Sequence, residues 1–179
     1  SQMVDLEDNL DLDNTFTVSA WVNSESSAAS AKILSKRNAA YSNGGYDFRI
    51  LSNGKINVTW KNVITTNISS STSLPVNEWH HVGIIYSNNT ASIYIDGILD
   101  KSVTTLSNPT NNAYSAVIGG AATDSPRQFY KGDMDELRVW KVALTPIQMR
   151  YIMNQEIEIN GSMVIGKIMP STVTKSEIS

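Results

Sequence analysis

The stretch WHHVGIIYSNNTASIYIDG (residues 79–97) decides the fold class. On either side of Asn88-Asn89, apolar and polar side chains follow the two-residue period of a strand that buries one face. Asp96-Gly97 closes the second run and leads into a third, ILDKSVT (98–104). Because such residue pairs readily adopt the positive φ angles of tight turns, the sequence predicts a three-stranded antiparallel meander.

Similar patterns extend in both directions from the meander. FTVSAWV (16–22) alternates so that Trp21 lies opposite the apolar face, and GYDFRI (45–50) with KINVTW (55–60) flanks an Asn-Gly turn. Two more strands are expected at 115–120 and 133–140. The spacing predicts an all-β, two-sheet antiparallel sandwich. The residues expected to fill its core are Phe16, Val18, Val22, Ile56, Val58, Ile93, Ile95, Leu137 and Val139.

One short helix is expected within residues 145–155. Thr145 is a suitable N-cap and Pro146 suits the first helical position, while Ile147, Tyr151 and Ile152 recur at helical spacing. The helix is expected to pack on the edge of the sandwich. The sequence thus predicts one domain over residues 1–155, followed by a tail or linker over 156–179 that contains a small hairpin at 156–168.

Composition excludes several classes of protein. Only 17% of the 179 residues are charged and the net charge is −3, which argues against a coiled coil and against a nucleic-acid-binding surface. No apolar run approaches the length of a membrane span, so no membrane insertion is expected. The absence of cysteine excludes a disulfide framework and thiol catalysis.

Four segments, in order, resemble laminin-G-like domains of the concanavalin A-like lectin-glucanase superfamily. They are FTVSAWVN (16–23), NGGYDFRILSNGKINV (43–58), EWHHVGIIYSNNTASIYIDGI (78–98) and GDMDELRVWKVALTPIQM (132–149). The resemblance implies a jelly roll with one concave sheet. Its members bind glycans, proteins or lipids or act as spacers, and some hold calcium. The segment MRYIMNQEIEINGSMVIGKIMP (149–170) is similar to large secreted surface proteins of marine-type bacteria, which implies an extracellular or cell-surface location.

The resemblance also implies that an opening strand, usual in the family before a segment like MVDLEDN (3–9), is absent here. An unpaired sheet edge would then remain. We expect a tail strand near 163–168, or a second molecule, to fill it.

Catalysis is not expected from this sequence. Laminarinase-type enzymes of this fold need three carboxylates on one strand face, whereas in DMDE (133–136) Asp133 and Asp135 share a face and Glu136 points away. His80 and His81 are adjacent strand residues that face opposite sides, so they cannot bind the same metal ion or act together at one site.

Two classes of function remain. The first is a carbohydrate-binding or adhesion module with a glycan or surface protein as its partner; the alternative is a structural spacer or protein-interaction domain. A glycan site needs exposed aromatic rings together with hydrogen-bonding side chains. Trp60 and Trp79 are expected in the core. The candidate ligand-binding residues are Trp21, Tyr41, Tyr46, Tyr114, Arg127 and Tyr130.

A structural calcium ion is the expected cofactor. Strand parity places Asp135 on the same face as Leu137 and Val139, at the margin of the core, where an unpaired carboxylate is costly. The acidic opening segment supplies Asp5, Asp8 and Asp11. If the termini meet, these oxygens would surround a calcium ion that clamps the first and last strands.

Overall fold

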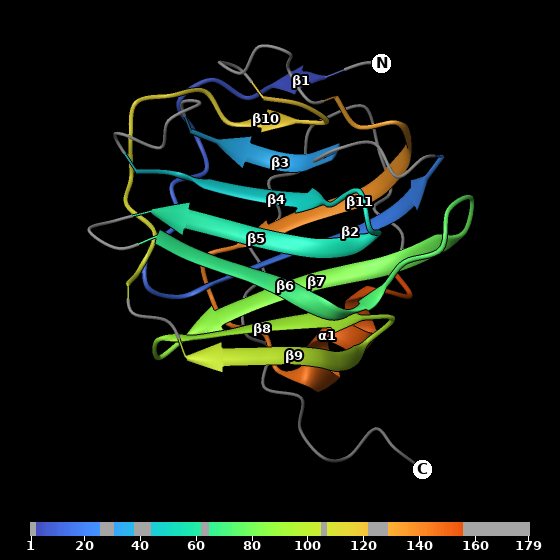
Figure 1. Ribbon diagram of the computed structural model, residues 1–179. Coiled ribbons are helices and arrows are strands. Elements are labelled where there is room, and N and C mark those ends of the chain that lie inside the picture. Colours follow the sequence, from blue (N-terminus) through green and yellow to red (C-terminus); the bar gives the residue numbers. More distant parts are fainter. Residues whose placement is uncertain are drawn as a thin grey trace.

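The computed structural model describes residues 3–25, 31–37, 44–61, 65–104, 107–121 and 129–155. In these ranges two antiparallel sheets lie face to face (Figure 1). One sheet has the order β1 (Val4–Asp5), β10 (Val117–Ile118), β3 (Ala31–Lys36), β4 (Tyr46–Ile50), β5 (Lys55–Lys61) and β6 (Thr65–Ser73). The other has the order β11 (Gly132–Trp140), β2 (Phe16–Ser24), β7 (Trp79–Ser87), β8 (Thr90–Ile95) and β9 (Ile98–Thr104).

The predicted sandwich is confirmed, together with the β7–β8–β9 meander and the β4–β5 hairpin. Three strands were not predicted, and one of them, β1, has only two residues. β6 (TTNISSSTS) is an edge strand that carries few apolar side chains, and β3 (AKILSK) follows a Ser/Ala-rich stretch that resembles a loop. The strand expected at 115–120 is shorter, because only Val117–Ile118 pairs with neighbours.

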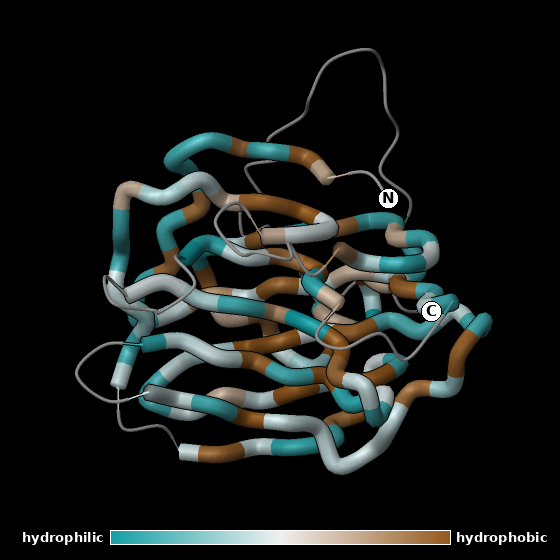
Figure 2. The backbone as a smooth tube through the Cα atoms, turned by 45° about the horizontal axis from the view of Figure 1, so that its top comes forward, coloured by the Kyte–Doolittle hydropathy of each residue, from teal (hydrophilic) through white to brown (hydrophobic). Residues whose placement is uncertain are grey.

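The core fills the space between the sheets. Phe16 packs within 5.2 Å of Tyr86 and 6.1 Å of Trp60, measured between ring centroids. Figure 2 shows hydrophobic and hydrophilic residues alternating along the strands that enclose this cluster. Six of the nine predicted core residues are buried, but Ile95, Leu137 and Val139 are only partly buried. Ile95 ends a strand, and the other two lie on edge strand β11.

A bulge in β11 changes its strand parity. Asp135 pairs with Trp21 of β2, whereas Arg138, three residues later, pairs with Ser19, only two residues away. The extra residue is Glu136, whose φ is +52°. Asp135 therefore points outward with Trp21, while Leu137 still packs on the core. The expectation that Asp135 shares the inward face of Leu137 is wrong.

The helix α1 (Pro146–Ile152) covers part of the outer face of the five-stranded sheet rather than an edge. Thr145 caps it in a capping box with Gln148. Its fully buried Met149 lies over Gly83 of β7, where a Cβ atom would be only 2.7 Å from the methionine methyl carbon. The buried stripe is Met149 and Ile152, so the predicted stripe was partly wrong: Ile147 and Tyr151 are exposed.

Over the described ranges, no helix is long and apolar enough to cross a bilayer. The predicted hairpin at 156–168, the tail strand near 163–168 and the linker character of 156–179 lie outside the described residues.

Candidate functional site

The outer face of the five-stranded sheet has a covered part and an open part. Helix α1 packs over Gly83 and Ile85 of β7. Further along the same strand face, a hollow of about 230 Å³ lies between Trp21 of β2, Trp79 of β7 and Asp135 of β11. Three strands that are distant in sequence therefore meet at this hollow.

Two tryptophans form the aromatic part of the hollow. Trp21 pairs with His81 and Asn23 with Trp79, so the two indoles are diagonal neighbours on one sheet face. The Trp21 ring contacts the His81 ring edge-on at 5.5 Å, and its Nε1–H donates to the Met153 carbonyl at 2.9 Å. Trp79 keeps 45% of its surface exposed, so its predicted place in the core is wrong.

Asp135 supplies the charge of the hollow. Its Oδ1 accepts the backbone N–H of Glu136 at 2.8 Å. The nearby guanidinium of Arg138 is engaged elsewhere, by the Glu136 carboxylate and the Ile152 carbonyl, each at 2.5 Å, and by the Gln155 carbonyl. Within the described residues Asp135 forms no ion pair, and its carboxylate is exposed.

Buried polar atoms lie beside the two tryptophans of the hollow. His81 is 2% exposed, and its Nδ1 forms no hydrogen bond within the described chain, nor does the buried Oδ1 of Asn23. Burial lowers the pKa of His81 to about 4, helped by Arg138 and opposed by the carboxylate of Asp96. The imidazole is therefore neutral at neutral pH and adds no charge of its own to this part of the face.

The outer face of the six-stranded sheet is also polar, but its groups bind one another. Fully buried Asp47 accepts Lys32 Nζ at 2.5 Å and Arg37 Nε at 2.6 Å. Arg49 Nε donates to Asn57 Oδ1 at 2.8 Å. Burial would raise the pKa of Asp47, but Lys32 and Arg37 outweigh it and hold the pKa below its ordinary value. Such mutual pairing is typical of a structural network.

Sequence reasoning missed this network. The signal was present in the alternation of Asp47 and Arg49 with apolar neighbours in YDFRI, and of Asn57 and Thr59 in the paired strand. These polar residues occupy one face of the predicted hairpin and could have been grouped by parity.

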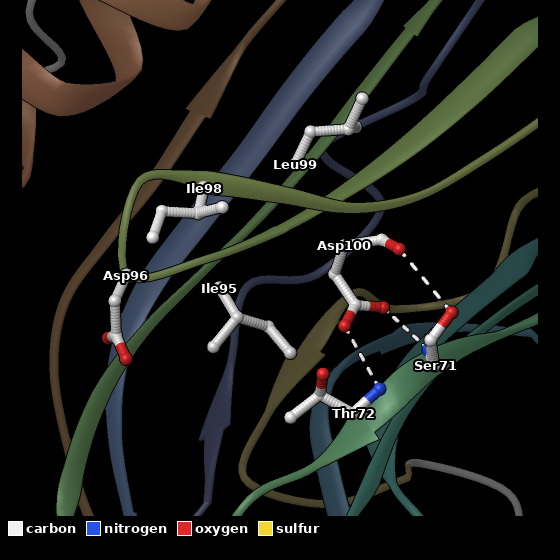
Figure 3. Close-up of a pocket in the computed structure, with 7 residues that line it drawn as sticks. All are labelled: Ser71, Thr72, Ile95, Asp96, Ile98, Leu99 and Asp100. Atoms are coloured by element: carbon white, nitrogen blue, oxygen red, sulfur yellow. Dashed lines mark hydrogen bonds between the residues drawn. The ribbon is translucent and has the colours of Figure 1, made fainter.

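A second hollow, of about 450 Å³, lies at the edge of the sandwich (Figure 3). Ile95, Ile98 and Leu99 give it an apolar lining. The Asp100 carboxylate accepts the backbone N–H groups of Ser71 at 2.5 Å and Thr72 at 2.9 Å, and so ties β9 to the edge of β6. With its carboxylate used in this way and no aromatic lining residue among those described, this hollow suits a saccharide less well.

The family model described as the concanavalin A-like lectin/glucanases superfamily matches residues 1–149. The chain belongs to this superfamily. No curated protein matches the sequence. The chain is similar to domain 4 of AbnA, a GH43 extracellular arabinanase from Geobacillus stearothermophilus solved with arabinotriose: TM-score 0.70, 24% identity, 84% of this chain and 71% of that chain covered.

Two further solved structures are similar to the chain at lower sequence identity. The CBM40 of a Ruminococcus gnavus IT-sialidase, bound to α2,3 sialyllactose, gives a TM-score of 0.67 at 12% identity, with 79% of this chain and 83% of that chain covered. A SAP-like pentraxin from Limulus polyphemus gives 0.56 at 18% identity, with 77% and 69% covered. These likenesses establish the concanavalin A-like fold.

On this concanavalin A-like fold, the predicted ligand-binding residues do not converge. Tyr46 is a core residue, because its ring packs on Phe48 at 5.3 Å and its hydroxyl donates to the Leu10 carbonyl at 2.7 Å. Tyr130 is also buried, so neither ring is available to a sugar and both expectations are wrong. Tyr114 is half-buried, and its carbonyl accepts Lys36 Nζ at 2.8 Å. Tyr41 and Arg127 lie outside the described residues.

The predicted calcium ligands do not converge either. Lys36 Nζ lies 2.5 Å from Asp8 Oδ1 and 3.4 Å from Asp11 Oδ1. Asp5 belongs to β1, the edge of the other sheet from Asp135 (Figure 1). Among the described residues no three His, Cys, Asp or Glu side chains gather as metal ligands. The four-aspartate clamp is therefore wrong, and calcium binding itself stays a prediction.

Proposed function

We propose that this chain is a non-catalytic carbohydrate-binding module and that its saccharide site is the hollow of Trp21, Trp79 and Asp135. One observation carries the proposal: an exposed indole stands beside a carboxylate that has no counter-ion within the described residues. Sugars present apolar C–H faces that stack on aromatic rings, and hydroxyl groups that donate to carboxylates. The hollow offers both kinds of contact on a rigid sheet.

The carboxylates of β11 support a binding role over catalysis. A glycosidase needs two carboxyl groups flanking the scissile bond, one of them held protonated by its surroundings. Asp133 and Asp135 share one face, as predicted, but that face points outward and both side chains are exposed to water. Glu136 is paired with Arg138 at 2.5 Å. No carboxyl group of DMDE is thus held in a buried, acid-like position.

An extracellular or cell-surface location follows from the same proposal. The arabinanase that shares this fold is extracellular, and its domain 4 was solved with a bound oligosaccharide. We propose a bacterial surface or secreted parent protein whose partner is a glycan, free or carried by another surface molecule.

Binding measurements with matched variants test the proposal. The chain is applied to a glycan array, with and without calcium, and hits are quantified by isothermal titration calorimetry. Trp79→Ala should weaken binding by about five- to 150-fold, since stacking on one ring contributes about 1–3 kcal/mol in comparable aromatic sites. The control is Ile98→Ala, which removes an exposed apolar side chain from the second hollow.

Equal weakening by both variants, or by Ile98→Ala alone, would place the site elsewhere. If no saccharide binds, the result favours the alternative of a structural spacer. The polar side chains on the outer face of the six-stranded sheet support that alternative, because they bind one another.

A further inference from the structure

We infer that the hollow of Trp21, Trp79 and Asp135 selects a protonated amino sugar over neutral and acidic sugars. The inference rests on the proposed function, because it names the class of saccharide that the same site takes. It depends on the charges around the hollow, on the aromatic walls and on the geometry of Asp135.

Negative charge is uncompensated on this part of the sheet. Asp135 pairs with Trp21 and Asp133 with Asn23, so both carboxylates project from the same outward face. Neither forms an ion pair within the described residues. Arg138 is occupied by Glu136 and by two carbonyl groups.

The imidazole of His81 adds no positive charge, because its pKa is about 4. Among the described residues, the lining of the hollow therefore includes one carboxylate and no cation.

The two indoles favour a cation for the same reason. The face of an aromatic ring carries the negative part of its quadrupole, and an ammonium group within about 6 Å of a ring centroid is attracted to it. Trp79 is exposed enough to receive a ligand, and Trp21 is fixed in place by its bond to Met153. Aromatic faces next to a carboxylate form the usual environment for a bound ammonium.

Desolvation separates the three classes of sugar. A neutral sugar that covers Asp135 removes water from a carboxylate and returns only hydroxyl hydrogen bonds. An ammonium group returns a charge-assisted hydrogen bond to the same carboxylate. A carboxylated or sulfated sugar places like charges together, which is repulsive. The site therefore discriminates by charge as well as by shape.

The geometry leaves one oxygen for the ligand. Asp135 Oδ1 already accepts the Glu136 N–H, so Oδ2 is available to an ammonium group. The hollow, about 230 Å³, is smaller than the pockets of about 300–1,000 Å³ that hold drug-sized ligands. One sugar ring therefore fits, with its face on Trp79 and its amino substituent toward Asp135.

Calorimetry with three families of β1,4-linked oligosaccharides tests the inference: glucosamine, N-acetylglucosamine and glucose oligomers of equal length. The measurements are made at about pH 6, where the amine is protonated and His81 is still neutral. We expect the glucosamine oligomer to bind at least about tenfold more tightly than the other two, and this preference to shrink as salt is added. Galacturonic acid oligomers should not bind.

Two variants with the same change in net charge complete the experiment. Asp135→Asn should abolish the preference for the amine, so that the glucosamine and glucose oligomers then bind with similar affinity. Asp5→Asn, on the edge of the other sheet, should keep the preference. Loss of the preference in both variants, or glucosamine binding that survives in Trp79→Ala, would show general charge attraction and overturn the inference.

The two proposals fail in different ways. If all neutral and amino oligomers bind equally and all are lost in Trp79→Ala, the amino-sugar inference is overturned and the carbohydrate site stands. If none of the oligomers and no array glycan binds the wild-type chain, the proposed function itself is overturned, and the inference with it.

Discussion

Asp135 and Trp21 lie directly opposite each other in the pairing of β11 with β2, and both side chains point away from the core. Glu136 is the extra residue of the bulge that follows, and beyond it Leu137 faces inward. A carboxylate and an indole thereby meet on the open face of the sheet.

Deletion of Glu136 should remove the bulge and leave this relationship intact. It makes Asp135 and Leu137 neighbours on a regular strand, where they still face opposite sides, so the free energy of unfolding should fall only by about 1–2 kcal/mol, through the lost pair with Arg138. Urea denaturation measures the loss. Glu136→Ala keeps the extra residue and should cost only about 1–2 kcal/mol, through the lost pair with Arg138. A loss of about 3 kcal/mol or more in the deletion variant alone would contradict this interpretation of the bulge.

The buried cluster around Asp47 should be highly sensitive to substitution and to acid. Asp47→Asn leaves Lys32 and Arg37 buried beside a neutral side chain and should cost about 3–5 kcal/mol at neutral pH. Because the folded-state pKa of Asp47 is lowered, its stabilisation is present above the unfolded pKa of about 4 and is lost as pH falls through the folded value. The free energy of unfolding, measured by urea denaturation between about pH 7 and pH 2, should therefore change less with pH in the variant than in the wild type.

His81 should give a separate pH dependence at milder acidity. Its folded-state pKa is about 4, against about 6.5 when unfolded, so the unfolded state binds the proton first as pH falls. Stability should decline between about pH 6.5 and pH 4, by roughly 3 kcal/mol. His81→Gln should lack this decline, whereas His80→Gln should keep it. An identical decline in both variants would assign the effect to other groups.

The contact between Gly83 and Met149 fixes how closely α1 approaches the sheet. Gly83→Ala places a methyl group against the Met149 side chain and should cost about 1–3 kcal/mol. Met149→Ala should cost about 2–5 kcal/mol through the cavity that it leaves. The double variant should lose less than the sum, because the new methyl group enters that cavity. Additive losses in thermal or urea unfolding would show that the two residues do not compete for one space.

Strand alternation made most of the fold predictable, because burial of one sheet face imposes a period of two on strands such as β2 and β8. The errors have identifiable causes. β6 is a polar edge strand with little core to face, and Glu136 adopts a positive φ although it is not a glycine, so no local signal marks the bulge.

The site was less predictable than the fold. Trp21 and Asp135 were selected for unrelated reasons, as a sugar-stacking ring and as a calcium ligand. Trp79 was expected in the core. Only the tertiary pairing of β11, β2 and β7 shows that these three side chains line one hollow.

The hydrogen bond from Trp21 to the Met153 carbonyl has a mechanical meaning. Arg138 holds the Ile152 and Gln155 carbonyls in the same way, so the chain just after α1 is fastened at the hollow. A force that pulls on the chain at residue 155 therefore acts on these hydrogen bonds before it acts on the paired strands of the sandwich. A ligand bound against Trp21 and Trp79 would stabilise this attachment, so the domain with ligand bound would unfold at a higher force than the domain without ligand.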